Sequence, residues 1–457
     1  MTLYYAEQPS ESTPVFYDQP DSQIPSTPLN KRVIMPSKMF LIKEELKTFA
    51  AQNPDTPIYN ASQGDGGLTL GGIPPRELAD ALIRYLPEEG STKYGDPTGR
   101  DDIREAILRN YYALESLTTD NIILGDGGRD LLQKWYQLIQ QASGQTGGSV
   151  VVSAAPWGSY MQGTYINCLN TILAPSSSNV SFQVTPEGID ASIRLGRESG
   201  KPVVALVITT PDNPTGNYLE IDAIRHLVQH AVASGIEFVL LDFMYQSVTD
   251  LGVELYDVNG LFESLTEEER NAVFILDGLT KSVGGSNLRN CHMVFGNSDH
   301  MQKLKGLATH SVLPNALGEA AALEVYGQAN PTEHPWVKRV VEPTARSRAI
   351  VREELTARGF KFIIGQGYYT FINIWPWLNR DIPEAYQFVD TISGEHIGRI
   401  DTVKQLKSYL AQKWGLAIIP GAFFHQPHFI RFSYANAPEY TRNAIQRLDE
   451  ALTSLTD

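Results

Sequence analysis

The sequence has 457 residues, 42% of them hydrophobic, and a formal net charge of −15 at pH 7, because 52 acidic residues outnumber 37 Lys and Arg. A chain of this length predicts two domains rather than one small core. The acidic balance and the lack of a dense Lys/Arg run argue against nucleic acid as a partner. No apolar stretch approaches the roughly 18 residues that a membrane helix needs, and the first residues lack a basic region followed by an apolar one. We therefore expect no membrane association and a cytoplasmic location.

The two cysteines, Cys168 and Cys291, stand far apart in apolar contexts. Buried free thiols in a reducing compartment are their expected state. The nine histidines form no cluster with cysteine at the spacing of metal ligands. The sequence therefore predicts no metal site.

The first part of the chain changes character twice. Residues 1–33 are rich in Pro, Ser, Gln and Asp and predict an arm that is extended or disordered on its own. From about residue 36 to 51 the spacing of apolar residues such as Leu46 and Phe49 suits an amphipathic helix. A glycine-rich stretch at 58–68 follows, where the backbone can approach a ligand closely.

Two short strands lead into turns that suit a ligand. The strand at 121–124 runs into a glycine turn, and a helix begins near Gly128 and Arg129. The free N–H groups and the positive dipole end of such a start predict a phosphate site. A second strand ends at Trp157, whose ring offers a flat face to a flat cofactor. Tyr160 is the alternative for this stacking role, and a tryptophan packed in the core is the plain structural interpretation.

Between residues 187 and 295 helical and strand-like segments alternate, which indicates a mostly parallel sheet covered by helices. Ligands of such sheets bind at the carboxyl ends of strands, which is where Asn213, Asp242 and Lys281 fall. Small neighbours leave the Lys281 amine room to meet a ligand, and an aldehyde held beside it would form an imine. The last hundred residues predict the short strands and helices of a smaller α+β domain.

Three motifs taken together carry a family resemblance. They are Asn-Pro-Thr-Gly at 213–216, Asp242 with Tyr245 three residues later, and Lys281 with Arg289 eight residues later. In order and spacing this set resembles the fold-type I pyridoxal-5′-phosphate (PLP) enzymes, and among them the aspartate aminotransferase-like (class I/II) family. The likeness covers the chain from about residue 55 onward.

The resemblance implies an α/β fold with four parts. Residues 1–33 would be the N-terminal arm, and residues 34–69 a segment that packs with the small domain. Residues 70–330 would form the large PLP-binding domain, with a mostly parallel seven-stranded sheet, and residues 331–457 the small α+β domain. A homodimer with active sites at its interface is also implied, with the arm lying across the other subunit.

The resemblance assigns cofactor roles to residues of this chain. Lys281 would hold PLP as an imine and later move a proton at the substrate α-carbon, while Asp242 would keep the pyridine nitrogen protonated. Tyr245 and Asn213 would hydrogen-bond the ring oxygen. The remaining cofactor contacts would come from Gly128, Arg129, Trp157 and Arg289, and from Tyr94, which would reach the phosphate bound by the other subunit.

The substrate end of the site is implied in the same way. Arg431 would pair with the substrate α-carboxylate, because a planar guanidinium grips a carboxylate at two points. Asn213 would stand beside this pair, and a main-chain N–H of the glycine loop at Gly66 would meet the same carboxylate. His310 or Ser311 would face the phosphate of the other subunit.

The implied activity is that of a PLP-dependent aminotransferase, which acts at the α-carbon of an amino acid and passes the amino group to a 2-oxo acid. Two positions depart from the family pattern: Gly278 stands where a phosphate-binding serine is frequent, and Asn287 where glycine is usual. These departures leave oxidation, β- or γ-replacement, cyclisation and decarboxylation open as alternatives on the same scaffold. The substrate side chain is not identified; its candidate contacts are Leu68, Trp157, His310, Tyr369 and the N-terminal arm.

Overall fold

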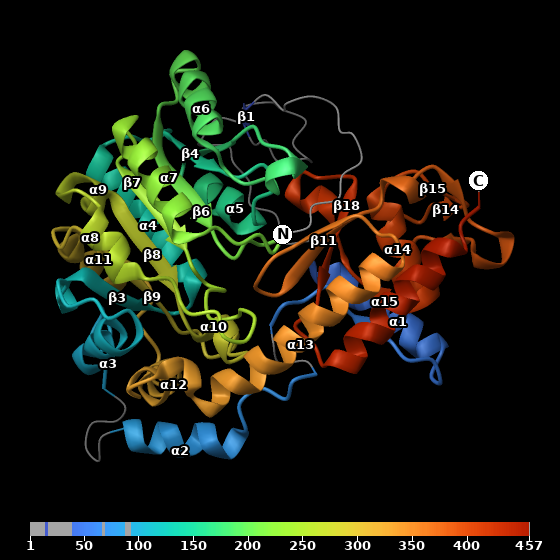
Figure 1. Ribbon diagram of the computed structural model, residues 1–457, viewed down its shortest axis with the longest axis horizontal. Helices are drawn as coiled ribbons and strands as arrows, with labels where there is room; N and C mark the ends of the chain where they lie inside the picture. Colours follow the sequence, from blue (N-terminus) through green and yellow to red (C-terminus); the bar gives the residue numbers. More distant parts are fainter. Residues whose placement is uncertain (1–13, 17–38, 66–68, 87–92, 457) are drawn as a thin grey trace.

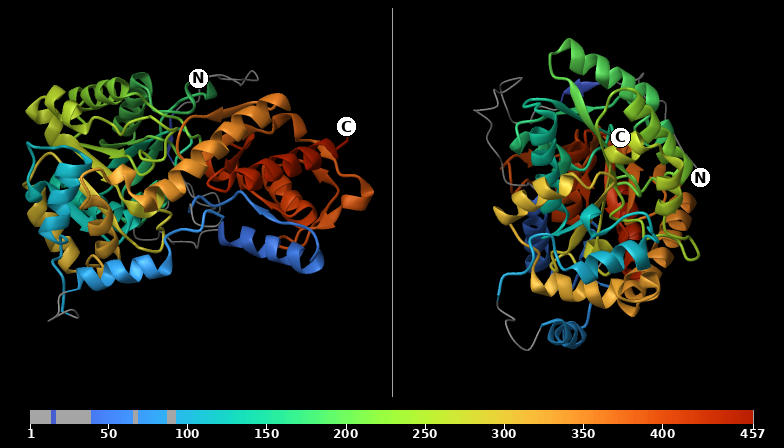
Figure 2. Two further views of the ribbon diagram at one scale, coloured as in Figure 1. Left: turned by 60° about the horizontal axis from the view of Figure 1, so that its bottom comes forward. Right: turned by 90° about the vertical axis from the view of Figure 1, so that its left-hand side faces the viewer.

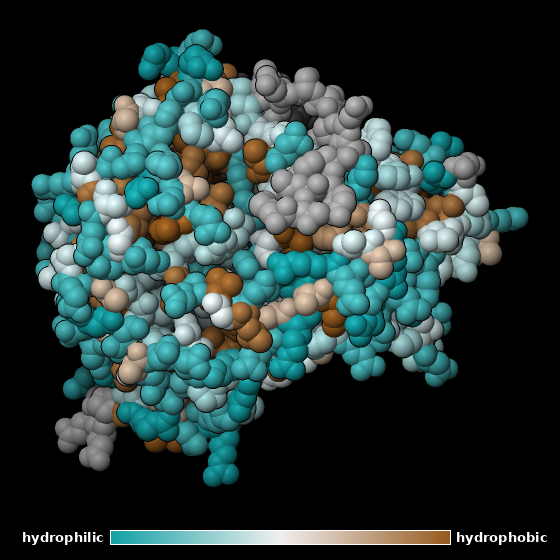
Figure 3. Space-filling model, in the orientation of Figure 1, coloured by the Kyte–Doolittle hydropathy of each residue, from teal (hydrophilic) through white to brown (hydrophobic). Residues whose placement is uncertain are grey.

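The structure is a computed structural model that describes residues 14–16, 39–65, 69–86 and 93–456. The predictions for Gly66 and Leu68, and for most of the arm, lie outside these residues. No helix in the described ranges is both long and apolar enough to cross a membrane. The face of the molecule in Figure 3 is mostly hydrophilic, with apolar side chains scattered over it.

An eight-stranded sheet forms the centre of the larger body (Figure 1), in the order β1-β5-β4-β6-β7-β8-β9-β3. Strands β4 to β8 are parallel, whereas β9 runs antiparallel to β8 and β3 antiparallel to β9. The predicted mostly parallel seven-stranded sheet is confirmed, and the two-residue β1 adds an eighth strand at one edge. The strands are β1 (Val15–Phe16), β3 (Ile122–Gly125), β4 (Ser149–Val152), β5 (Asn170–Leu173), β6 (Val203–Thr209), β7 (Phe238–Asp242), β8 (Val273–Asp277) and β9 (Cys291–Phe295).

Helices cover both faces of this sheet, because alternate residues of each buried strand point to opposite sides. In β7, Val239 and Leu241 enter one core and Leu240 enters the other. The first core is closed by α3 (Asp101–Ala106), α6 (Pro186–Glu198), α7 (Ile221–Ala233), α8 (Val258–Ser264) and α12 (Ala316–Tyr326), on which α2 (Pro75–Tyr85) packs. The second is closed by α4 (Gly128–Ser143), α5 (Gly158–Ile166) and α11 (His300–Thr309).

The arm meets its own chain at the one place where the structure describes it. Val15 and Phe16 pair antiparallel with Leu173 and Ile172 at the sheet edge. An edge strand leaves backbone groups unpaired, so a short extended segment readily adds to it. The implied placement of the arm across another subunit stays a prediction.

A second body is built from the C-terminal part of the chain (Figure 2). Its four-stranded antiparallel sheet has the order β10-β11-β18-β17. The strands are β10 (Phe362–Ile364), β11 (Tyr369–Asn373), β17 (Ile419–Pro420) and β18 (Phe429–Ser433), and the main helices are α13 (Pro335–Ala357), α14 (Val403–Trp414) and α15 (Pro438–Thr453). Two-residue pairings complete it: β12 (Arg380–Asp381) with β15 (Arg399–Ile400), and β13 (Phe388–Val389) with β14 (His396–Ile397).

The N-terminal segment packs against this second body. Helix α1 (Met39–Gln52) lies on α14, and β2 (Tyr59–Asn60) pairs in parallel with β16 (Leu416–Ala417). Glu45 is buried on α1, and its carboxylate pairs with the Lys407 amine at 2.7 Å. The domain boundaries at 69/70 and 330/331 stay predictions.

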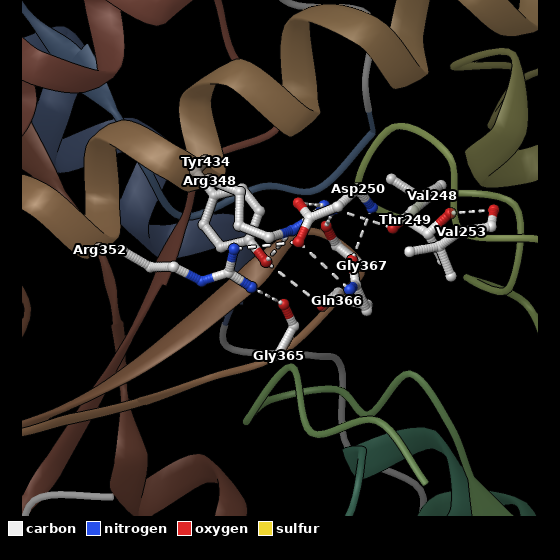
Figure 4. A network of polar contacts seen from close by, with 10 residues as sticks. All are labelled: Val248, Thr249, Asp250, Val253, Arg348, Arg352, Gly365, Gln366, Gly367 and Tyr434. Atoms are coloured by element: carbon white, nitrogen blue, oxygen red, sulfur yellow. Dashed lines mark hydrogen bonds and ion pairs between the residues drawn. The ribbon is translucent and has the colours of Figure 1, made fainter. Parts of the chain in front are cut away.

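A polar network around helix α13 ties the two bodies together (Figure 4). Arg348 of α13 is fully buried and donates to the Asp250 carboxylate at 2.6 Å. It also donates to the backbone carbonyls of Val248 and Gly367, each at 2.8 Å, and its Nε donates to the Tyr434 hydroxyl at 3.2 Å. One guanidinium therefore joins a loop of the large sheet, the turn before β11 and the end of β18.

Arg352, one turn further along α13, extends the network. It donates to the second Asp250 oxygen at 3.0 Å and to the Gly365 carbonyl at 2.8 Å. Burial opposes ionisation of Asp250, but Arg348 and Arg352 outweigh it and hold the pKa of this carboxyl below its usual value. The network therefore links the two bodies through ion pairs and hydrogen bonds.

Replacing Arg348 with Met should lower the free energy of unfolding by about 3 kcal/mol, because it leaves buried oxygens without donors and an unbalanced carboxylate. The matched control is Arg346→Met on the same helix, where the arginine side chain is 62% exposed; its effect should stay within about 0.5 kcal/mol. Urea unfolding of both variants measures the difference. Equal effects would contradict the importance of the network.

Candidate active site

The predicted site residues come together at the carboxyl ends of the central strands. Asp242 ends β7, Tyr245 follows it, and Lys281 stands on the short helix α10 (Leu279–Ser282) after β8. Asn213 lies in the loop after β6, and Arg431 enters from β18 of the second body. Strands of a parallel sheet end at one edge, which explains why residues distant in sequence meet here.

The Lys281 amine is half-buried and lies near two partners. Its Nζ donates a hydrogen bond to the Gly64 carbonyl at 2.6 Å and lies 5.6 Å from the centre of the Tyr245 ring. The Tyr368 hydroxyl donates to the Lys281 carbonyl and fixes the backbone of α10. The amine therefore lies between the N-terminal segment, which carries Gly64, and the large body, which carries Tyr245.

Asp242 is buried and is held by neutral donors. The Tyr160 hydroxyl donates to it at 2.5 Å and the Met244 N–H at 3.1 Å. Burial raises the pKa of Asp242, while these two hydrogen bonds and the positive charge of Lys281 oppose the rise. Such a carboxyl favours a cationic partner, as a protonated ring nitrogen would be.

Tyr160 and Trp157 take different places, although the sequence left both open for stacking. The Tyr160 hydroxyl is used by Asp242 and also lies 2.8 Å from the Thr209 hydroxyl. The half-buried Trp157 ring stands edge-on to the Tyr160 ring, with 5.4 Å between ring centres. Only Trp157 keeps a partly open ring.

An anion cradle lies at the start of α4. Gly127, with φ of +88°, precedes the helix, and a Cβ built there would overlap the Arg289 guanidinium. Arg289 donates to backbone carbonyls, those of Asp126 at 3.1 Å and Ser286 at 3.0 Å. Positive charge and free helix amides at one point favour a phosphate group.

Arg129 adds a second guanidinium close to this cradle. It is exposed, and its Cζ lies 5.6 Å from the centre of the Trp157 ring. Desolvation, together with the positive charge of Arg289, lowers the pKa of Arg129. An anion bound between the two would relieve this repulsion.

Arg431 is the buried cation of the site, only 2% exposed. It donates to the Asn213 side-chain oxygen and to the Ser62 carbonyl, each at 2.7 Å. Its Nε has no hydrogen-bond partner among the described residues. The rings of Tyr369 and Phe424 cover the guanidinium at 4.2 and 5.2 Å. A buried positive charge whose partners are neutral favours an anionic ligand such as a carboxylate.

Other predicted residues stay outside this cluster. Tyr94 is 95% exposed, and His310 and Ser311 are exposed at the end of α11. Their predicted contacts are with another subunit, and they remain predictions. Both cysteines are free, and Cys168 is only partly buried, unlike the expectation. No group of three metal-ligating side chains occurs within the part of the chain that the structure describes.

The sequence did not reveal several residues that hold the site. Tyr160 holds Asp242, and the Ser62 carbonyl holds Arg431. Asp277, just before Gly278, is buried and accepts from the Gln246 amide at 2.6 Å, and burial raises its pKa to about 7. Only the position of Asp277 at the end of a buried strand could have indicated from the sequence that it belongs to the site.

The departure at Gly278 has a steric reason. A Cβ at this position would lie 2.6 Å from Cys291 Cα and 2.8 Å from the Asn290 carbonyl. The two neighbouring strands approach too closely for a serine. The frequent family serine is therefore excluded here by the backbone of β9.

Gly278→Ser should lower the free energy of unfolding by about 1–3 kcal/mol, because the added atoms overpack a backbone contact. The control is Gly306→Ser on α11, where a Cβ would meet nothing within 4 Å. Thermal unfolding of the cofactor-free proteins reports both. A Gly278→Ser protein as stable as the control would show that the strands can separate freely.

Comparisons with known proteins agree with this arrangement. Residues 61–448 match the family described as Aminotransferase class I and II. The aspartate aminotransferase of Bacillus sp. (strain YM-2) is 24% identical over 422 residues, covering 92% of this chain and 97% of that protein. The probable aspartate/prephenate aminotransferase of Aquifex aeolicus (strain VF5) is 23% identical over 432 residues, with 92% and 97% covered.

Solved structures show the same fold. The aspartate aminotransferase from Rhizobium meliloti superposes with a TM-score of 0.76 at 20% identity, covering 95% of this chain and all of that one. Aspartate aminotransferase from Thermus thermophilus with maleate gives a TM-score of 0.73 at 20% identity, with 92% and 97% covered. By its match over residues 61–448, the chain belongs to the class I and II aminotransferase family of enzymes.

Proposed function

We propose that this chain is a PLP-dependent aminotransferase that moves the amino group of an amino acid to a 2-oxo acid. The carrying observation is the set of charges around one space: the Lys281 amine, the buried Asp242, and the cations Arg289 and Arg431. An aldehyde, a basic ring nitrogen, a phosphate and a substrate carboxylate each find a matching partner in this set.

The residues at this site fit each part of PLP. Arg289 and the backbone amides of Gly128 and Arg129 would hold the phosphate, and Trp157 would cover the ring. Asn213 uses its side-chain oxygen for Arg431, so its NH₂ group stays available for the ring oxygen. Tyr245 would donate to the same oxygen.

Bound PLP supplies an electron sink that stabilises negative charge at the substrate α-carbon. Residues of the chain would bind the substrate, orient it and move the proton. Arg431 would fix the carboxylate at two points and so orient the bond to be broken, and Asp242 would hold a proton on the ring nitrogen. The Lys281 amine, once released, would carry the proton to and from the α-carbon, with the Gly64 carbonyl positioning it.

Several further assignments belong to this proposal. The substrate is an amino acid with a free α-carboxylate; the compared relatives are named as aspartate or aspartate/prephenate aminotransferases. The chain would act as a homodimer, in which the 95% exposed Tyr94 finds a partner. We also retain the proposed domain division, with the large domain at 70–330, the small domain at 331–457 and a cytoplasmic location.

The test is a spectral titration of the PLP-loaded protein with a panel of L-amino acids. A substrate should convert the visible band to the ultraviolet band of the aminated cofactor, and a 2-oxo acid should reverse it. Product formation that needs no oxo acid, or that consumes oxygen, would contradict transamination and favour the other reactions of this scaffold. Absence of a visible band would contradict PLP binding itself.

Lys281→Ala should abolish the visible band and transamination, because no other described amine is held at this place. The control is Lys305→Ala, an exposed lysine on α11, which should retain both. Absorbance spectra and amino-group transfer assays measure the effect. A visible band of full intensity in Lys281→Ala would contradict the assignment.

Arg431→Gln should raise KM for the amino acid on the order of 100-fold, because it removes a charge-assisted two-point contact. PLP affinity should change little. The control Arg442→Gln alters an exposed arginine of α15 that pairs with Glu354 at 2.9 Å, and its KM should equal that of the wild type. Steady-state kinetics decide, and an unchanged KM in Arg431→Gln would place the carboxylate elsewhere.

A further inference from the structure

The side chain of Asn315, the residue before helix α12, joins the start of that helix to two turns at the anion cradle. Its Oδ1 accepts the Gly318 N–H at 2.8 Å and so caps the helix. Its Nδ2 donates to the Asp126 carboxylate at 2.8 Å. The same Nδ2 donates to the carbonyls of Leu288 at 3.1 Å and Arg289 at 3.2 Å. One amide therefore uses its oxygen for the helix and its NH₂ group for the cradle.

The backbone of Arg289 depends on such contacts. Arg289 has a φ of +52°, in the left-handed region that residues other than glycine rarely adopt. An unfavourable backbone conformation persists only where the surrounding structure holds it. The carbonyls of Leu288 and Arg289 belong to the peptide planes on either side of the arginine Cα, and Asn315 contacts both. These two hydrogen bonds therefore fix the direction in which the arginine side chain leaves the backbone.

Asn315 also holds the turn that the Arg289 side chain contacts. The Arg289 guanidinium donates to the Asp126 carbonyl at 3.1 Å, and Asn315 donates to the carboxylate of the same aspartate. From the other side, the Asp126 N–H donates to the Asp130 carboxylate on α4 at 2.9 Å. The arginine and the turn that its guanidinium contacts are therefore both attached to one amide.

Close packing of α12 fixes the place of Asn315 itself. A Cβ on Gly318, in the first turn of the helix, would lie 2.7 Å from the Leu288 carbonyl oxygen. The next residue, Glu319, is buried and accepts from the Arg100 N–H at 3.0 Å. The start of α12 therefore cannot shift without opening these contacts.

We propose that Asn315 is a positioning residue for the phosphate end of the cofactor site, where its NH₂ group sets the backbone and the direction of Arg289. The inference rests on the proposed function, in which Arg289 holds the phosphate of PLP. Helix capping alone needs only the side-chain oxygen, which serine or aspartate could also supply. The NH₂ group instead contacts three oxygens of the cradle. Asn315 would act through Arg289, and no covalent bond forms or breaks.

Asn315→Ser separates the two uses of the side chain, because a serine hydroxyl can cap the helix but supplies no NH₂ group. The affinity of the cofactor-free protein for PLP, measured by titration of the visible band, should fall on the order of tenfold, the worth of one weakened hydrogen bond to a charged group. The affinity for pyridoxal, which has the same ring and aldehyde but no phosphate, should change less than about twofold. Equal losses for both ligands, or no loss for PLP, would overturn the proposal.

The matched control is Asp257→Ser. The exposed Asp257 caps α8 in the same way, accepting the Gly260 N–H at 2.8 Å, and this variant should bind both ligands as the wild type does. A second variant, Asn315→Asp, keeps the shape and the capping oxygen but places an oxygen against the Asp126 carboxylate. Its loss of PLP affinity should be at least as large as that of Asn315→Ser. Wild-type PLP affinity in Asn315→Asp would overturn the proposal.

A second measurement separates this inference from the proposed function. Inorganic phosphate should raise the thermal unfolding midpoint of the cofactor-free wild type, and at the same concentration the rise should be less than about half as large in Asn315→Ser. Such a difference, with no visible band in any variant, would contradict PLP binding and leave the link between Asn315 and the anion cradle standing. Equal rises, with a normal visible band and equal PLP affinities, would overturn the link alone.

Discussion

The site depends on keeping Arg431 as a buried cation whose hydrogen-bond partners are neutral oxygens. Asn213 comes from the loop after β6, and the Ser62 carbonyl comes from the N-terminal segment. Burying such a charge costs free energy unless an anion pairs with it, and the rings of Tyr369 and Phe424 cover the guanidinium that water would otherwise solvate. The surroundings of Arg431, and with them the proposed carboxylate site, therefore form only when segments of both bodies are assembled.

That assembly is secured by backbone contacts that tolerate no side chain. Gly216 and Gly365 pack backbone against backbone, so that a Cβ on either would collide with a carbonyl oxygen of the other segment. Arg348 then fixes the adjoining turn to Asp250. The same joint that stabilises the two bodies also sets the position of Tyr369, so stability and site geometry share one structural cause.

Sequence patterns were sufficient where chemistry is local. The strand ends with Asn213, Asp242 and Lys281 lie together as expected, because parallel strands deliver their carboxyl ends to one edge. Contacts between distant segments had no local signal. Tyr160 reaches Asp242 across 82 positions and Arg348 reaches Asp250 across 98. The sequence indicated only a stacking role for Tyr160 and no role for Arg348.

The glycine at position 278 is another feature that contacts between distant segments explain and that the local sequence does not. The reason for the glycine lies in the fold, where β9 places the Cys291 backbone directly against Gly278. The arm gives a further example, because its described residues Val15 and Phe16 pair with the edge of their own sheet, which the composition of the arm did not indicate. A sequence does not state which edge is free.

The most direct measurement is to load the protein with PLP, reduce the linkage with borohydride and map the modified peptide by mass spectrometry. The account predicts one stoichiometric pyridoxyl group on Lys281. Labelling spread over exposed lysines such as Lys305, or no label at all, would contradict it.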